Sequence, residues 1–154
     1  MVPHQPDRPR CGCGRRGPTP GRMVLMDKVS LRGIDVYAHH GVHPAERELG
    51  QRFVIDVDLW VDCAIAARTD SLTAALDYTE VHRRICAVTA ENSFHLIEAL
   101  AGRLCRALLE GFPVDRVRVR VKKPNPPIPS FLGTAAVTFE RDQAWLEDER
   151  GRQK

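Results

Sequence analysis

The segment VKKPNPPIPS, residues 121–130, places two lysines where an alternating, strand-like run meets a cluster of prolines. The valines of that run fall on one face, so Lys123 continues the valine face and Lys122 continues the opposite one. Pro124 removes a backbone donor and ends strand pairing, which leaves the Lys123 ammonium at the rim of the core. An inward-facing lysine needs a carboxylate, an aromatic face or a ligand. A structural ion pair and a functional cation are therefore both open at Lys123.

Glu98 and Tyr78 are candidates for a binding carboxylate and a proton donor. Glu98 falls near the start of a predicted helix, at the margin of its apolar stripe. With Asn92 or Ser93 as the helix cap, the Glu98 charge would also complement the positive end of the helix dipole without any function. Tyr78 falls where the chain enters an earlier helix, so its hydroxyl is either a donor at a site or the polar end of a packed aromatic side chain.

Three histidines, His39, His40 and His43, lie within five positions of one another and close to Glu46 and Glu48. Imidazoles in such a cluster can ligate zinc, act as acid or base near neutral pH, or hydrogen-bond to the backbone of a turn. The sequence alone favours the last of these. The chain has no serine-nucleophile motif and no C-x-x-C pair.

Hydrophobic periodicity predicts strands and helices in the order ββααββ. Residues 51–63 alternate apolar and polar side chains almost strictly and residues 27–41 do so more loosely, which predicts an antiparallel pair joined by a polar connection over 44–50. Two segments of helical spacing follow, and residues 116–122 and 133–142 return to the period of a strand. The apolar stripe of the second helix consists of Ile97, Leu100, Ala101, Leu104, Cys105 and Leu108. This order predicts an α+β fold in which two helices cover one face of a four-stranded antiparallel sheet.

The length and charge of the chain predict one folded domain. With 154 residues the chain can bury a core of its own, which we expect over residues 26–143, followed by a charged tail over 144–154. The net charge is +3, but residues 1–22 hold five arginines against one aspartate, so the remainder carries −1. A near-neutral body gives no reason to expect nucleic acid or a membrane as a partner. No apolar run approaches the roughly 20 residues that cross a bilayer.

Residues 1–25 are rich in proline, glycine and arginine, and we expect them to form a disordered extension. Met1, Met23 and Met26 are all candidates for the translation start. Cys11 and Cys13 form a lone C-x-C pair, which is a weak basis for a zinc site. The cysteine count of five is odd and shows no disulfide framework, so we expect free thiols in a reducing cytoplasm.

Four segments together resemble the dihydroneopterin aldolase family of folate biosynthesis in order and spacing: GIDVYAHHGVHPAERELGQRF, SLTAALDYTEV, FHLIEALAGRL and VKKPNPPIP. The resemblance runs from about Met26 to Arg141, and the proline loop combined with the glutamate-bearing helix is its most specific part. It implies the tunnelling fold, with a sheet in sequential strand order and subunits joined edge to edge into a tetrameric barrel, usually stacked into an octamer. A closed ring of this kind pairs both exposed edges of each sheet.

The resemblance also implies roles for particular residues. The family cleaves the side chain of 7,8-dihydroneopterin between its first two carbons, giving 6-hydroxymethyl-7,8-dihydropterin and glycolaldehyde. Glu98, with the backbone around Ile97, would bind the amino group and ring N–H of the pterin. Lys123 would stabilise the developing alkoxide and take part in proton transfer, while Tyr78 of a neighbouring chain protonates the enol-like intermediate. Glu46 would position the substrate side chain and its water.

No metal, Schiff base or cofactor is implied, because the imine of the pterin itself accepts the electrons of the breaking bond. The nearest alternative is dihydroneopterin triphosphate epimerase, which shares the fold and the retro-aldol intermediate but lacks the PNPPIP loop. A zinc enzyme such as pyruvoyl-tetrahydropterin synthase would need histidines that converge from separate strands. A non-catalytic pterin-binding ring is a third alternative, and an epimerase side activity is compatible with the aldolase.

Sequential strand order would also place opposite charges side by side on the face away from the helices. Strand parity puts three acids of the second strand and three bases of the third on that face, which would line the tunnel of the ring. Neighbouring strands would then pair acids with bases, and such cross-strand pairs stabilise a sheet. The residues concerned are Asp56, Asp58 and Asp62 with Arg116, Arg118 and Arg120.

Overall fold

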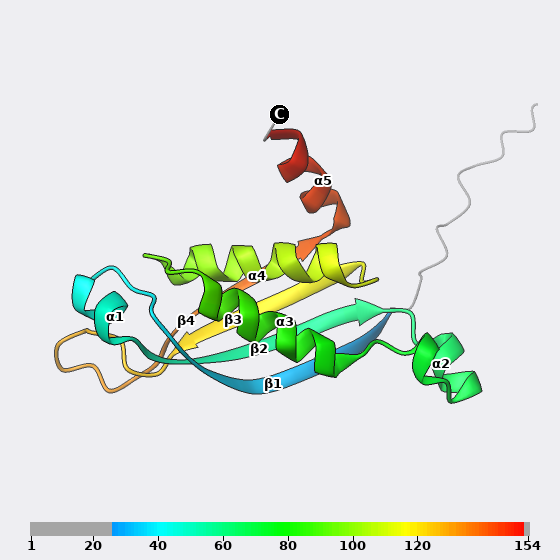
Figure 1. Cartoon of the computed structure of the whole chain (residues 1–154), viewed down its shortest axis with the longest axis horizontal. Helices are drawn as coiled ribbons and strands as arrows, with labels where there is room; N and C mark the ends of the chain where they lie inside the picture. The colour runs from blue at the N-terminus through cyan, green and yellow to red at the C-terminus, as the bar shows by residue number, and fades with distance from the viewer. Residues whose placement is uncertain (1–25, 153–154) are drawn as a thin grey trace, which may run out of the picture.

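A computed structural model describes residues 26–152, and the predicted extension with Cys11 and Cys13 lies outside the described residues. The four strands form one antiparallel sheet in the order β1-β2-β3-β4 (Figure 1). The strands are β1 (Asp27–Ala38), β2 (Gln51–Val61), β3 (Arg116–Lys123) and β4 (Ala135–Asp142). The helices are α1 (Pro44–Leu49), α2 (Ala64–Thr69), the 3₁₀ turn η1 (Leu72–Ala74), α3 (Tyr78–Glu91), α4 (Ile97–Gly111) and α5 (Gln143–Arg152).

The two long helices α3 and α4 cover one face of the sheet, as the sequence predicts (Figure 1). Asp77 caps α3, because its carboxylate accepts hydrogen bonds from the backbone N–H groups of Thr79 and Glu80 at 2.8 and 3.3 Å. The predicted stripe of α4 packs against the valine face of β3 and against β4, and it joins the apolar face of β2 in one core. The resulting core has a central layer of fully buried side chains: Phe53, Ile55, Leu59, Ile85, Leu100, Leu104 and Leu108.

A β-bulge explains why the first strand alternates only loosely. Leu31 pairs with Val57 and Ile34 with Ile55, so two residues of β1 lie opposite one residue of β2. Gly33, one of the two, has φ +70°, a conformation that glycine adopts without strain. The bulge shifts the side-chain alternation by one position and so hides the period of the strand in the sequence.

The charge pairing on the uncovered face is confirmed in part. Asp56 lies opposite Arg120 and Asp58 opposite Arg118, as expected. The expectation for Asp62 is wrong, because β2 ends at Val61 and the Asp62 carboxylate accepts a hydrogen bond from the N–H of Ala64 at 2.8 Å. Arg116 instead lies opposite Trp60, with its guanidinium carbon 4.1 Å from the centroid of the indole ring.

Helical turns appear where the sequence predicted none. The connection over residues 44–50 contains α1, and most of residues 144–154 belongs to α5, whose Leu146 is fully buried. Gln143 ties α5 to the core, since its side-chain amide donates to the carbonyls of Leu109 and Val114 at 3.2 and 2.8 Å. Within residues 26–152, no helix has the length and apolar character that spanning a membrane requires.

Candidate functional site

The inward-facing lysine meets a carboxylate at the end of the sheet. Lys123 is the last residue of β3, is only 8% exposed, and donates to Oε1 of Glu46 on α1. The same oxygen accepts a hydrogen bond from the side-chain amide of Gln51 at 3.0 Å, and the other oxygen accepts from the N–H of His43 at 3.1 Å. These contacts hold both oxygens of the Glu46 carboxylate in place. Among the described residues, Glu46 is the only one with which Lys123 forms a hydrogen bond or an ion pair.

The protonation state of Glu46 follows from these contacts. Partial burial, the largest influence, acts to raise the pKa of Glu46. Hydrogen bonds from Lys123, Gln51 and His43, together with the lysine charge, outweigh burial and hold the pKa below its ordinary value. Glu46 is therefore a carboxylate at neutral pH, paired with a cation that sits at the rim of the core.

A tight loop before α1 holds Glu46 in place. The Arg47 guanidinium donates to the carbonyls of Gly41 and Val42, both at 2.7 Å. Gly41 has φ +151°, and a Cβ built on it would collide with the Glu46 carboxylate. Only glycine leaves room for the acid at this position.

The start of α4 is attached to the same loop. Ser93 donates its hydroxyl to the carbonyl of His39 at 2.5 Å, and the N–H of Gly41 donates to the carbonyl of Phe94 at 2.9 Å. This contradicts the expectation that Asn92 or Ser93 caps the second helix: Asn92 ends α3, and the N-cap position of α4 is Leu96. Ser93 serves to join the loop to the helix start instead.

The rings of His39 and His40, two of the three histidines, have separate partners. His40 is fully buried between Phe53 and Phe94, at ring-centroid distances of 5.3 and 5.5 Å. Its Nδ1 accepts from the N–H of Phe94 at 3.1 Å, and burial lowers its pKa, so the ring is neutral with its hydrogen on Nε2. The Nδ1 atom of His39 lies 2.9 Å from the carbonyl oxygen of Arg47. Over residues 26–152, no group of three or more His, Cys, Asp or Glu side chains is placed to hold a metal ion.

Glu98 lies in the first turn of α4, next to the half-buried Ile97. Its side chain is exposed and makes no hydrogen bond or ion pair with any described residue. The free backbone N–H groups of a first helical turn lie at the positive end of the helix dipole and favour an anion there. Both oxygens of Glu98 are therefore free to accept hydrogen bonds from a ligand.

Tyr78 does not join this group within one chain. It begins α3 and is 64% exposed. The other end of α3 leads directly to Ser93 and the site loop, and a helix of 14 residues is about 20 Å long. The structure thus brings together Lys123, Glu46 and the start of α4, while Tyr78 lies one helix length away.

The sequence analysis missed Gln51, Gly41 and Arg47, which hold Glu46. A signal for part of this was present, because Pro44 and Glu46 follow His43 at the spacing of a helix start, with proline at the first helical position and glutamate at the third. A helix of six residues is too short for its apolar period to be recognised.

A sequential four-stranded sheet covered by two helices, with a lysine–carboxylate pair where the third strand ends, defines the subunit of a tunnelling-fold protein. A family model described as FolB, dihydroneopterin aldolase, matches residues 29–140. A dihydroneopterin aldolase of Streptococcus pyogenes is 36% identical over 119 residues, which is 77% of this chain and all of that protein. The chain belongs to the dihydroneopterin aldolase family.

Solved structures agree with this assignment. The Escherichia coli dihydroneopterin aldolase in complex with neopterin is similar with a TM-score of 0.70 and 26% identity, over 75% of this chain and 99% of that one. A Burkholderia dihydroneopterin aldolase bound to guanine has a TM-score of 0.64 and 28% identity, over 77% of this chain and 92% of that one. Neopterin and guanine share an amino-pyrimidinone edge.

Substituting Gly41→Ala tests whether the loop positions Glu46. The added methyl group displaces the carboxylate, and small misplacements in a site cost on the order of 10- to 100-fold in rate. We expect kcat/KM for dihydroneopterin to fall by that amount. Gly33→Ala is the matched control, because Gly33 also has a positive φ but nothing lies within 4 Å of its added Cβ. Equal activities of the two variants would contradict the positioning role of Gly41.

Proposed function

We propose that this chain cleaves 7,8-dihydroneopterin by a retro-aldol reaction to 6-hydroxymethyl-7,8-dihydropterin and glycolaldehyde. The observation that carries the proposal is the buried Lys123–Glu46 pair beside a helix start whose Glu98 has no partner among residues 26–152. One feature supplies charge and proton transfer, and the other supplies recognition of a flat, nitrogen-rich ring. Membership of the family adds support, since its relatives carry the same activity in their names.

Glu98 would bind the pterin edge. A carboxylate accepts two parallel hydrogen bonds from an amino group and the adjacent ring N–H, whereas an amide in its place would present a donor to one of them. The backbone at Ile97 would add a contact to the same ring. The neopterin and guanine of the two structural neighbours have this edge in common, which supports recognition of the edge before recognition of the side chain.

Lys123 and Glu46 would manage the protons of the bond cleavage. A base removes the hydroxyl proton of the substrate side chain, the carbon–carbon bond breaks, and its electrons move into the imine of the dihydropterin. The Lys123 ammonium would stabilise the alkoxide that precedes cleavage and relay the proton, with Glu46 holding the lysine and a water. Tyr78 would then protonate the enol-like intermediate.

Tyr78 can take this role only from another chain. The separation of Tyr78 from Lys123 by the length of α3 supports a site shared by two subunits. The sheet also leaves β1 and β4 as edge strands, each with one side unpaired among the described residues. We propose edge-to-edge assembly into a ring, as a tetramer or a stacked octamer, in which each Tyr78 completes a neighbour's site.

Two alternatives make different products. Dihydroneopterin triphosphate epimerase would return a changed stereocentre without glycolaldehyde, and a binding ring would return the substrate unchanged. The proline loop after Lys123 favours the aldolase, and an epimerase side activity follows from the shared intermediate. The three cysteines of the described residues are free thiols, and burial raises the pKa of Cys105 to about 12, which supports a reducing cytoplasm as the location.

The reaction needs no metal in this proposal, because the substrate contains its own electron acceptor and the rings of His39 and His40 have other partners. We expect full turnover after prolonged treatment with a strong chelator and gel filtration. Loss of activity that added zinc restores would contradict this expectation and would reopen a ligand role for His39, His40 and His43.

Two substitutions separate recognition from chemistry. Glu98→Gln should weaken neopterin binding by about 1–3 kcal/mol, because one donor of the pterin edge then meets an amide N–H. Lys123→Ala should keep the affinity and lower kcat by about 10²- to 10⁴-fold. Turnover of 7,8-dihydroneopterin with product identification and titration with neopterin measure the two effects.

Neighbouring residues give matched controls for both variants. Glu91→Gln makes the same change at the exposed end of α3, and Lys122→Ala removes the adjacent lysine on the opposite face of the sheet. Glu91→Gln should behave as the unmodified protein, and Lys122→Ala should keep its kcat although it unpairs Asp56. Unchanged neopterin affinity in Glu98→Gln, or unchanged kcat in Lys123→Ala, would refute the corresponding role.

A further inference from the structure

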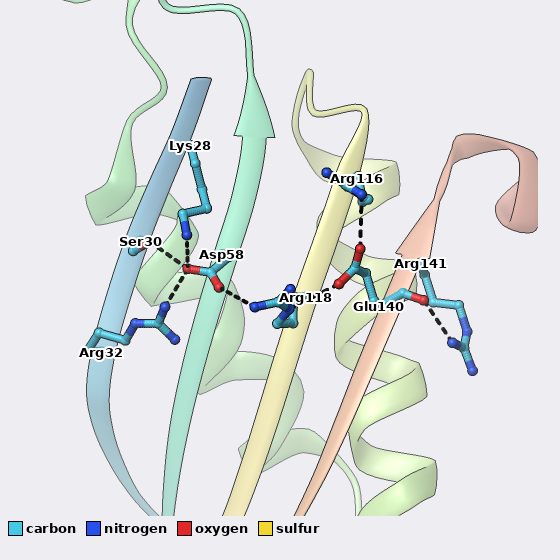
Figure 2. A network of polar contacts seen from close by, with 8 residues as sticks. All are labelled: Lys28, Ser30, Arg32, Asp58, Arg116, Arg118, Glu140 and Arg141. Atoms are coloured by element: carbon cyan, nitrogen blue, oxygen red, sulfur yellow. Dashed lines mark hydrogen bonds and ion pairs between the residues drawn. The ribbon is translucent and has the colours of Figure 1, made fainter. Parts of the chain in front are cut away.

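On the uncovered face of the sheet, buried carboxylates lie beneath more exposed guanidinium groups. The Asp58 side chain is 0% exposed and contacts Arg32 at 2.7 Å and Arg118 at 3.6 Å, whose side chains are about half exposed (Figure 2). Asp56 is 6% exposed and forms an ion pair with Lys122 at 2.7 Å. Asp56 and Asp58 are therefore covered and neutralised by the bases, while the partly exposed Glu140 pairs with Arg116 and Arg118, each at 3.0 Å.

Arg120 takes no part in this ion pairing. It lies opposite Asp56 in the strand register, but Asp56 already binds Lys122 and accepts a hydrogen bond from the N–H of Gly33 at 2.9 Å. Arg120 is exposed and forms no hydrogen bond or ion pair with any residue that the structure describes. An unpaired guanidinium beside two paired ones makes the local charge positive.

All four strands contribute side chains to one hollow. The hollow has a volume of about 340 Å³ and is lined by Arg32, Asp56, Arg118, Arg120 and Thr138. The β-bulge of β1 presents Arg32, the alternation of β3 presents Arg118 and Arg120, and Thr138 of β4 lies opposite Arg120. Three guanidinium groups thus share a concave surface with one carboxylate that is already neutralised. We call this the sheet-face hollow.

We propose that the sheet-face hollow binds a phosphate-bearing anion, with Arg120 as its main contact and Arg32, Arg118 and Thr138 as further donors. A guanidinium donates two parallel hydrogen bonds to a pair of phosphate oxygens, and several such groups match the several oxygens of a di- or triphosphate. A carboxylate offers only one pair of oxygens and would use one of the three arginines. The chemistry of the lining therefore favours phosphate.

This site is separate from the proposed active site. Strand alternation puts Arg120 on the face opposite Lys123, so the sheet itself lies between the two sites. The hollow is complete within one chain and does not depend on the proposed activity. In the proposed ring the same face would line the tunnel, and a bound anion would enter along the tunnel axis.

Trp60 offers a local readout. The guanidinium carbons of Arg116 and Arg118 lie 4.1 and 5.5 Å from its ring centroid, so an anion that moves Arg118 changes the surroundings of the indole. The chain has two tryptophans, and a Trp145→Phe background leaves Trp60 as the single emitter. Inorganic tripolyphosphate, GTP and sodium sulfate are titrated at constant ionic strength while Trp60 emission is followed.

We expect a saturable change with tripolyphosphate and a weaker one with sulfate. Tighter binding of GTP than of tripolyphosphate identifies a nucleotide as the ligand class, and the reverse order identifies a free polyphosphate. Arg120→Gln should weaken binding by about tenfold or more, because it removes a charge-assisted bidentate contact. Arg103→Gln, at an exposed arginine of α4, is the matched control and should bind as the background protein does.

Turnover of dihydroneopterin by Arg120→Gln should equal that of the background, which shows that the variant is folded and assembled. A linear, unsaturable response to all three anions would overturn the proposal. Equal weakening by Arg120→Gln and Arg103→Gln would also overturn it, because the effect would then be general charge screening. Arg120→Lys gives a further check, since it keeps the charge and should retain only part of the affinity.

Discussion

The site depends on one ion pair: the buried ammonium of Lys123 requires a negatively charged partner, and Glu46 supplies it. Strand alternation turns Lys123 toward the helices, and Pro124 ends the strand there, so the ammonium would be unpaired without Glu46. A buried ion pair is seldom the most stable filling for such a position, because desolvation offsets much of the attraction. The chain nevertheless devotes a short helix, a glycine and two further side chains to holding the pair, which is the expected pattern for a functional group.

Strand alternation also divides the sheet between two kinds of chemistry. Lys123 lies on the helix-covered face and pairs with Glu46. Its neighbour Lys122 lies on the uncovered face and pairs with Asp56. The covered face holds an apolar core with the proposed active site at its rim. The uncovered face holds a layer of ion pairs with spare positive charge. Only one side of each edge strand is paired within the described chain, which leaves both edges open for the proposed assembly.

Much of this fold could be predicted from hydrophobic period and strand parity, including the inward direction of Lys123 and the two long helices. The resemblance to a family supplied the strand order and the roles of Glu46 and Glu98. The contact between Glu46 and Lys123 spans 77 positions in the sequence, so no local pattern could predict it. The errors at Ser93 and Asp62 have opposite causes. The sequence predicts that Ser93 caps the helix beside it, but its hydroxyl binds the distant carbonyl of His39. The sequence predicts that Asp62 pairs across strands, but β2 ends at Val61 and the Asp62 carboxylate binds the nearby N–H of Ala64.

The central claim is that Lys123 of one chain and Tyr78 of another form one active site, and mixing two inactive variants tests it most directly. Lys123→Ala and Tyr78→Phe are each purified, then unfolded and refolded together at equal amounts. Random assembly into rings gives about one quarter of sites with both residues intact, so we predict about a quarter of the original dihydroneopterin turnover. A mixture no more active than the separate variants would contradict a site shared between subunits.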